Sequence, residues 1–188
     1  MMKKPMAVLF FVMCALTAYA QDDPRMDDKH EIKTNAFNLI LFKAPQFSYE
    51  YLINEESSFG ASIMFNLVET EDGSWSDEPY YYERFAFTPY YRRFISSKYA
   101  RGFFFEAFGM YNVQGDYDGD WDSNGGITYS DETSGNLAFG IALGGKLVSK
   151  GGFLLEFYGG VGRNIITGNQ NFANDFVPRA GLSLGYRF

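Results

Sequence analysis

The chain has 188 residues, with 16 lysines and arginines against 23 aspartates and glutamates, so its length suits one domain and its formal net charge is −7. This acidic balance, with no Lys/Arg cluster to neutralise phosphates, excludes a nucleic-acid-binding surface of the usual basic kind. Aromatic residues form 19% of the chain, a high share that the fold has to explain.

Residues 1–20 have the layout of a secretory signal peptide. Lys3 and Lys4 precede an apolar run over residues 6–16, and Ala-Tyr-Ala at 18–20 is a typical cleavage site. Gln21 is then the expected first residue of the mature protein, and Cys14 is lost with the leader. The mature chain therefore has no thiol for disulfide, metal or nucleophile chemistry. No later segment reaches eighteen consecutive apolar residues, so we expect no transmembrane helix.

After a mobile lead-in over residues 21–30, residues 31–188 break into short runs with a period of two. Residues 46–51 strictly alternate polar with aromatic side chains, and residues 181–188 repeat the pattern. The predicted strands span residues 31–42, 46–53, 58–67, 83–95, 102–112, 136–148, 153–165 and 176–188. This pattern predicts an all-β fold, an eight-stranded antiparallel up-and-down barrel.

The connections alternate in length, which is typical of outer-membrane barrels with long external loops. The expected short turns are residues 54–57, 96–101 and 149–152, and the expected long loops are residues 68–82, 113–135 and 166–175. The connection at 43–45 is a short exception on the external side. An even number of strands places both termini on the periplasmic side.

Side-chain size predicts which face of each strand points outward. One face carries Phe47, Tyr49, Tyr51, Phe59, Ile63, Phe65, Phe85, Phe87, Tyr91, Phe103, Phe105, Phe139, Ile141, Phe153 and Phe157. The other carries Ser48, Gly60, Ser62, Ala86, Thr88, Ala138, Gly140, Ala142, Gly144, Gly160, Gly162, Gly181, Ser183 and Gly185. An eight-stranded barrel is only just wide enough for side chains, so the bulky face should look outward, into lipid.

The face predicted to be internal also collects charges, which suggests an interior plugged by ion pairs. These residues are Glu50, Glu106, Glu156, Arg84, Arg92, Lys146, Arg179 and Arg187. Arg92 should pair with Glu106, and Lys146 with Glu156, on adjacent strands. We interpret the charges as structural rather than as a transport or catalytic path. An interfacial aromatic girdle is predicted from Tyr80, Tyr81, Tyr82, Tyr90 and Tyr111.

The residues give little support for an enzyme. The single histidine, His30, lies before the predicted first strand, so a Ser/His/Asp site would depend on a mobile segment. Glu106 and Glu156 could do acid–base work but are expected to be structural. The glycines at 159–162 lack the strand–turn–helix context of a phosphate loop. We predict no catalytic residue, cofactor or metal.

One acidic segment leaves an alternative open. Asp120, Asp122, Asn124, Thr128 and Asp131 occupy positions one, three, five, nine and twelve of a calcium-loop template, but the last is not the usual glutamate. No helices are predicted on either side. The preferred interpretation is a solvated acidic surface loop, with calcium binding as the alternative.

The C-terminal residues 181–188, with Tyr186 and a final Phe188, resemble the assembly signal of outer-membrane barrels. The motifs at 32–35, 49–51, 144–146 and 159–163 extend this resemblance to a family of small bacterial outer-membrane barrels of unknown function, similar in architecture to the OmpX and OmpA barrels. The resemblance implies a cell outer membrane location, with outer-membrane lipid and the barrel assembly machinery as partners. It carries over no catalytic residue. The expected function is a scaffold that displays loops; the alternative is a narrow channel or lateral-diffusion transporter for small solutes.

Overall fold

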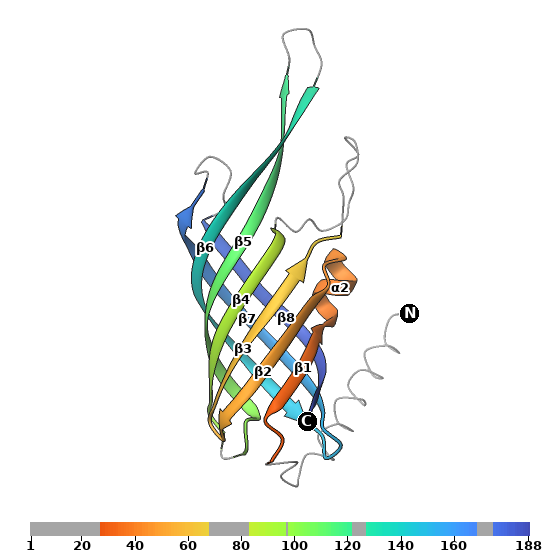
Figure 1. Cartoon of the computed structure of the whole chain (residues 1–188), viewed down its shortest axis with the longest axis vertical. Coiled ribbons are helices and arrows are strands. Elements are labelled where there is room, and N and C mark those ends of the chain that lie inside the picture. Colours follow the sequence, from red (N-terminus) through yellow and green to blue (C-terminus); the bar gives the residue numbers. More distant parts are fainter. Residues whose placement is uncertain (1–26, 68–82, 97, 122–126, 169–174) are drawn as a thin grey trace, which may run out of the picture.

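The computed structural model describes residues 27–67, 83–96, 98–121, 127–168 and 175–188, and for residues 115–121 and 127–132 it describes the backbone alone. The elements are β1 (His30–Asn35), α2 (Ala36–Phe42), β2 (Gln46–Asn54), β3 (Ser57–Phe65), β4 (Glu83–Phe94), β5 (Gly102–Trp121), β6 (Ile127–Val148), β7 (Phe153–Thr167) and β8 (Phe176–Arg187). Each strand pairs with the next in antiparallel fashion, and β1 pairs with β8 (Figure 1). The predicted closed, eight-stranded antiparallel barrel is therefore confirmed.

The period-two pattern also predicted the facing of the strands correctly. On the outer surface, thirteen of the fifteen bulky residues assigned there are exposed, including Phe103 (69%), Ile141 (69%) and Phe153 (71%). The other two, Ile63 and Phe85, are half-buried. Alternate residues of a strand lie on opposite faces, so a bulky outer face leaves the small and charged residues inside.

The interior nevertheless contains large aromatic rings that the size argument had excluded from it. Tyr90 and Phe104 are almost fully buried, and inward-facing glycines make the space for such rings. A Cβ atom at Gly144 would lie 2.5 Å from Cζ of Phe104, and one at Gly181 would lie 2.5 Å from Cζ of Tyr158. The small residues of the inner face thus leave room for large side chains that reach in from other strands.

The predicted first strand, residues 31–42, is wrong in its second half. The strand β1 ends at Asn35, whose Oδ1 accepts hydrogen bonds from the backbone N–H groups of Phe37 (3.1 Å) and Asn38 (3.3 Å) and so caps α2. The helix ends at Phe42, and the C-cap residue Lys43 adopts a left-handed conformation with φ of 51°. Residues 36–42 are apolar almost without a break, and such a run does not distinguish strand from helix.

The predicted loop at 113–135 is for the most part a continuation of β5 and β6. Their ladder runs without interruption as far as the pair Trp121 and Ile127, and the resulting hairpin projects well beyond the other strands (Figure 1). Pairing with β4 stops at Gln114 and pairing with β7 stops at Asn136. The predicted loop at 68–82 lies outside the described residues, as does most of the predicted loop at 166–175.

The two ends of the barrel differ. One end, the turn end, carries the short connections after β2, β4 and β6 together with Phe188, and the other end, the loop end, carries α2 and the β5–β6 hairpin (Figure 1). Buried aromatic and aliphatic side chains lie in two clusters, one with Leu52, Phe94 and Tyr99 and one with Met64, Tyr90 and Met110. Among the described helices none is long and apolar enough to cross a membrane.

Candidate functional site

Charged side chains fill the middle of the barrel and form what we call the interior ion network. Its members are Glu31, Lys33, Glu50, Arg92, Glu106, Lys146, Glu156, Arg179 and Arg187, each at most 5% exposed. Seven of the strands supply these residues, and β3 adds the Ser58 hydroxyl, which donates to Glu50 Oε1 at 2.5 Å. The network therefore ties every strand of the wall to the centre of the barrel.

Arg92 is the centre of the network. Its Nε donates to Glu106 Oε2 at 2.7 Å, which confirms the predicted pair. Its two terminal nitrogens donate to Glu156 at 2.6 and 2.9 Å, and Nη1 also donates to Glu50 at 2.8 Å. The guanidinium lies 4.3 Å from the ring centre of Phe104, a cation–π distance. A guanidinium bound in this way on all sides is held in one orientation.

Lys146 forms the predicted ion pair with Glu156, but its closer contacts reach across the lumen. It lies directly opposite Glu156 in the β6–β7 register, as predicted, but its Nζ is 3.9 Å from that carboxylate. Shorter contacts of 2.7 Å go to Glu31 and to Glu50. Lys33 lies closer to Glu156 than Lys146 does. Its Nζ donates to Glu156 at 2.9 Å and also to Glu50.

Glu31 and Lys33 were missed as network members from the sequence. Both are buried, and they share the inward face of β1 with Asn35. The alternation Glu31, Lys33, Asn35 against Ile32 and Thr34 is the signal that could have placed them inside.

At the turn end, the connection after β4 fills the lumen. Arg187 donates from Nε to Glu31 Oε1 at 2.9 Å, and its terminal nitrogens donate to the carbonyl oxygens of Tyr99 (3.4 Å) and Ala100 (2.8 Å). Ala100 is fully buried and has a left-handed φ of 41°. The guanidinium of Arg187 thus holds this turn inside the wall.

At the loop end, β1 is too short to pair with all of β8, and the Asn35 side chain binds the backbone groups of β8 that are left over. Its Nδ2 donates to the Ala180 carbonyl oxygen at 3.2 Å, and its Oδ1 accepts from the Leu182 N–H at 3.3 Å. Both are backbone groups of β8 that a longer β1 would have paired. The same Nδ2 lies 2.9 Å from Gln46 Oε1 and 3.3 Å from the Tyr158 hydroxyl. One side chain therefore joins α2, β2, β7 and β8.

A layer of amides crosses the barrel nearer the hairpin. Asn112 donates to Asn164 at 3.1 Å, Asn136 donates to Asn112 at 3.1 Å, and Ser134 donates to Asn136 at 2.8 Å. All four residues are buried. Neutral amides can satisfy one another in this position without adding charge to the lumen.

Two sequence-based assignments near this end are corrected. Arg84 was predicted to point inward, but a register shift between Glu83 and Phe85 buries Glu83 instead and leaves Arg84 half-buried. Tyr90 was predicted in the aromatic girdle, but it is 2% exposed inside the barrel, whereas Tyr111 is exposed as predicted. Residues 80–82 of the girdle lie outside the described residues.

The two carboxylates considered for acid–base work, Glu106 and Glu156, are poorly placed to act as general bases. Glu106 contacts both Arg92 and Arg179, each at 2.7 Å, and Glu156 contacts Arg92 and Lys33. A carboxylate held by two cations is stabilised in its charged form and is a poor proton acceptor. His30 lies at the turn end, where its Nδ1 is 2.6 Å from the Tyr49 hydroxyl and its ring stacks on Phe188.

The described residues contain no group of three His, Cys, Asp or Glu residues placed to hold a metal. Of the calcium template, Asp120, Thr128 and Asp131 lie in paired strands, where the ladder joins Asp120 to Thr128. Asp122 and Asn124 lie outside the described residues, as do the side chains of the other three. The calcium hypothesis therefore remains an untested alternative.

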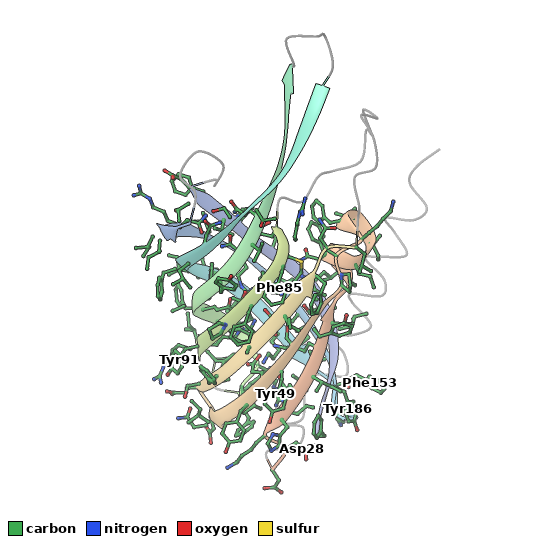
Figure 2. All side chains as sticks on the ribbon, turned by 45° about the horizontal axis from the view of Figure 1, so that its top comes forward. Asp28, Tyr49, Phe85, Tyr91, Phe153 and Tyr186 are labelled. Atoms are coloured by element: carbon green, nitrogen blue, oxygen red, sulfur yellow. The ribbon has the colours of Figure 1, made fainter. Side chains whose placement is uncertain are left out.

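No family model, no curated protein and no solved structure matches this chain. An inference about its function must therefore start from the surfaces and the interior of the barrel. In Figure 2, Tyr91 and Phe153 project from opposite sides of the wall, away from the lumen.

Proposed function

We propose that the mature chain is an integral outer-membrane barrel that serves as a scaffold for the segments at its loop end and has no catalytic activity. One observation carries the proposal, namely that the polarity of the fold is reversed. Phe103, Phe139 and Phe153 are 61–71% exposed outside, while Arg92 and Glu50 are at most 1% exposed inside. A protein dissolved in water buries large apolar groups and exposes charges.

The apolar surface surrounds the barrel rather than forming one patch. Each strand contributes exposed large apolar residues, such as Ile32 on β1, Phe47 on β2, Phe59 on β3, Phe87 on β4 and Phe105 on β5. Apolar patches on monomeric soluble proteins rarely exceed several hundred Å². A closed β-barrel, whose strands satisfy one another's backbone groups, is one of the two structures that can span a bilayer. Lipid is the solvent that suits such a surface.

The leader and the C-terminus support the same location. Residues 1–20 would direct export, and the terminal strand ending at Phe188 would be recognised by the barrel assembly machinery. The backbone of Phe188 pairs with His30 at 2.8 and 3.0 Å, so the last residue closes the barrel at the turn end. In the proposed orientation the turn end faces the periplasm and the β5–β6 hairpin faces outward.

A filled interior favours the scaffold over a channel. Arg92, Phe104 and Lys146 are each at most 1% exposed, and they lie across the path that a solute would have to take. A conducting barrel needs a continuous wet route. A narrow channel or lateral-diffusion transporter is therefore the less favoured of the two proposed functions.

Membrane fractionation combined with a detergent gel tests the location. We expect the protein in the outer-membrane fraction, with different mobility for boiled and unboiled samples because a closed barrel resists detergent. Recovery in the soluble periplasmic fraction with identical mobility would contradict the proposal. Recordings in planar bilayers then separate the two readings, since a scaffold gives a silent trace and a channel gives reproducible current steps.

A further inference from the structure

One buried carboxyl group lies apart from the interior ion network. Glu83, the first residue of β4, is 3% exposed. Each of the four carboxylates of the network contacts at least two cations. Glu83 forms no ion pair with any described residue, and its side chain shares a hydrogen bond with that of Gln114 on β5. A buried carboxylate without a cation is costly, so this group favours its protonated form.

The strands beside Glu83 place acidic rather than basic residues near it. On β5, Gln114 lies opposite Glu83, and the next charged residue toward the loop end is Asp116. Asp116 opposes Glu132 of β6 in the ladder. Toward the turn end, the residues of β5 between Gln114 and Glu106 are all uncharged, and Glu106 is bound to two arginines.

The exterior cations at the loop end do not pair with Glu83 either. Lys43 and Arg163 are exposed, and Arg163 lies 3.9 Å from Asp175. Arg84, the next residue of β4, is half-buried, and no ion pair joins it to Glu83. Three stretches of this end lie outside the described residues, and they contain no lysine, arginine or histidine, namely residues 68–82, 122–126 and 169–174. These stretches therefore cannot supply a counter-ion for Glu83.

Glu83 lies outside the part of the barrel that is proposed to cross the membrane. The ring centre of Phe85 is 5.5 Å from that of Phe65 and 6.4 Å from that of Tyr111. Such an aromatic band belongs at the membrane–water interface, and Glu83 lies two residues beyond Phe85 toward the loop end. Burial raises the pKa of the Glu83 carboxyl group from its usual value near 4.5 to about 7.

The start of β4 is also the least regular part of that strand. On the β5 side the ladder shifts register between Glu83 and Phe85. On the β3 side the regular ladder stops at the pair of Phe65 and Phe85, and beyond it the Asn66 N–H donates to the Arg84 carbonyl oxygen at 2.9 Å. Strand ends of this kind open locally at a lower cost than the middle of a sheet.

We propose that the Glu83 carboxyl group is a pH-dependent latch at the loop end of the barrel. While it is protonated, it stays buried beside Gln114 and holds the first residues of β4 in the wall. Once it is ionised, the carboxylate moves into water and takes residues 83–84 with it, because no cation holds it inside. The chain before β4 is then attached to the wall at Phe85. The latch adds a response to pH to the proposed scaffold, and it does not depend on the membrane location.

The direction of the response follows from the two states of the carboxyl group. In the wall it keeps its proton up to about pH 7, and in water it loses the proton near pH 4.5. The closed start of β4 is therefore most stable below about pH 4.5, loses stability as the pH rises to about 7, and loses no more above that.

Spin labels on residues 21–188 in maltoside micelles test the latch. Cys14 is the only cysteine of the chain, so these residues can carry a single engineered thiol. A nitroxide on Arg84→Cys reports the start of β4, and one on Arg163→Cys, which is exposed at the same end, is the matched control. The measurement is the mobile fraction of each spectrum at about pH 6 and about pH 8. A group with a pKa of about 7 is about 9% ionised at the first pH and about 91% at the second, so the mobile fraction at position 84 should rise about tenfold.

Glu83→Gln separates ionisation from packing, because it keeps the shape of the side chain but cannot ionise. With this substitution the label at position 84 should keep its low mobile fraction at both pH values. An unchanged spectrum with Glu83 present would overturn the latch, and an equal rise in Glu83→Gln would overturn Glu83 as the titrating group. An equal rise at position 163 would overturn a local release in favour of general loosening. Gel mobility on the same samples reports the barrel separately, so failure of the latch is distinguishable from failure of the proposed function.

Discussion

At the scale of single residues, cations, carboxylates and aromatic rings fill the interior of this barrel, and each contacts several of the others. Glu50 contacts Arg92 at 2.8 Å and Lys146 at 2.7 Å, and the ring of Tyr90 lies 4.4 Å from the Arg92 guanidinium. Removing one partner of a buried ion pair lowers the free energy of unfolding by more than the intact pair contributes to it. The reason is that the remaining partner stays charged and is shielded from water. The effect of a substitution therefore depends on which cation it strands.

Replacing Glu156 with alanine should destabilise the barrel strongly. Arg92 and Lys33 would each lose a carboxylate, and the interior ion network would keep its five cations with three carboxylates. Removal of one partner of a buried pair typically costs about 3–5 kcal/mol. Unfolding titrations in lipid vesicles can compare Glu156→Ala with Phe157→Ala, its exposed neighbour. An effect of Glu156→Ala no larger than that of the control would show that the network is not needed for stability.

Gly181 should tolerate no side chain while Tyr158 is present. A Cβ atom there would lie 2.5–2.6 Å from three atoms of the Tyr158 ring and hydroxyl. Overpacking of this kind costs about 1–3 kcal/mol. In a double-mutant cycle, Gly181→Ala should be destabilising alone and almost neutral beside Tyr158→Ala. Gly159→Ala, where nothing lies within 4 Å of the added atom, serves as the control. Additive effects of the two substitutions would contradict the packing.

At the scale of elements, the notable feature is the place where a strand becomes a helix. β1 has six residues, and α2 then continues beside β8 with Phe37, Leu39, Ile40 and Leu41 exposed. A helix interrupts the ladder here because the Asn35 side chain satisfies backbone groups on both sides of the break. The wall is closed at this point by one amide rather than by a ladder.

Substitutions at Asn35 should separate its two roles. Asn35→Ser keeps an acceptor for the helix N-terminus but cannot reach Ala180 or Gln46, and Asn35→Ala loses both functions. Loss of a cap costs about 1 kcal/mol, and each lost hydrogen bond about 1 kcal/mol more. Unfolding titrations should therefore rank wild type above Asn35→Ser and Asn35→Ser above Asn35→Ala. Equal stability of the two variants would contradict the capping role.

The sequence predicted most of the wall and part of the interior. Alternation placed residues 46–51 and 181–188 correctly, since one face of each run is bulky and the other is small or charged. It could not separate strand from helix over residues 36–42, where the apolar run has no period of two. The Arg92–Glu106 pair followed from strand adjacency. The closer partners of Lys146, Glu31 and Glu50, did not, because contacts across a lumen depend on closure of the barrel and on the length of the side chain.

At the scale of the whole molecule, the closure of the barrel does not depend on the part of the β5–β6 hairpin that projects beyond it. The ring of eight strands is complete without the outer part of the β5–β6 hairpin, because β4 pairs with β5 only as far as Gln114 and β7 pairs with β6 only as far as Asn136 (Figure 1). The last buried side chains at this end are those of Glu83, Gln114 and Ser134, just beyond the amide layer around Asn112. Beyond Gln114 in β5 and Gly135 in β6, the ladders of the described residues join these two strands only to each other.

Shortening the hairpin should therefore leave the barrel intact. Replacing residues 116–132 with Asn-Gly joins Gly115 to Thr133, which face each other in the ladder, through a turn that suits a two-residue hairpin. We expect the shortened protein to keep the gel mobility shift and to unfold within about 1 kcal/mol of the full-length barrel, since the strand pairing that closes the ring is kept. A matched deletion inside the barrel, removing residues 110–112 and 136–138, takes out the Asn112–Asn136 bond and should abolish the shift. If the shortened hairpin alone abolished the shift, the projecting segment would be part of the folding unit, and the barrel would not be a scaffold that carries it.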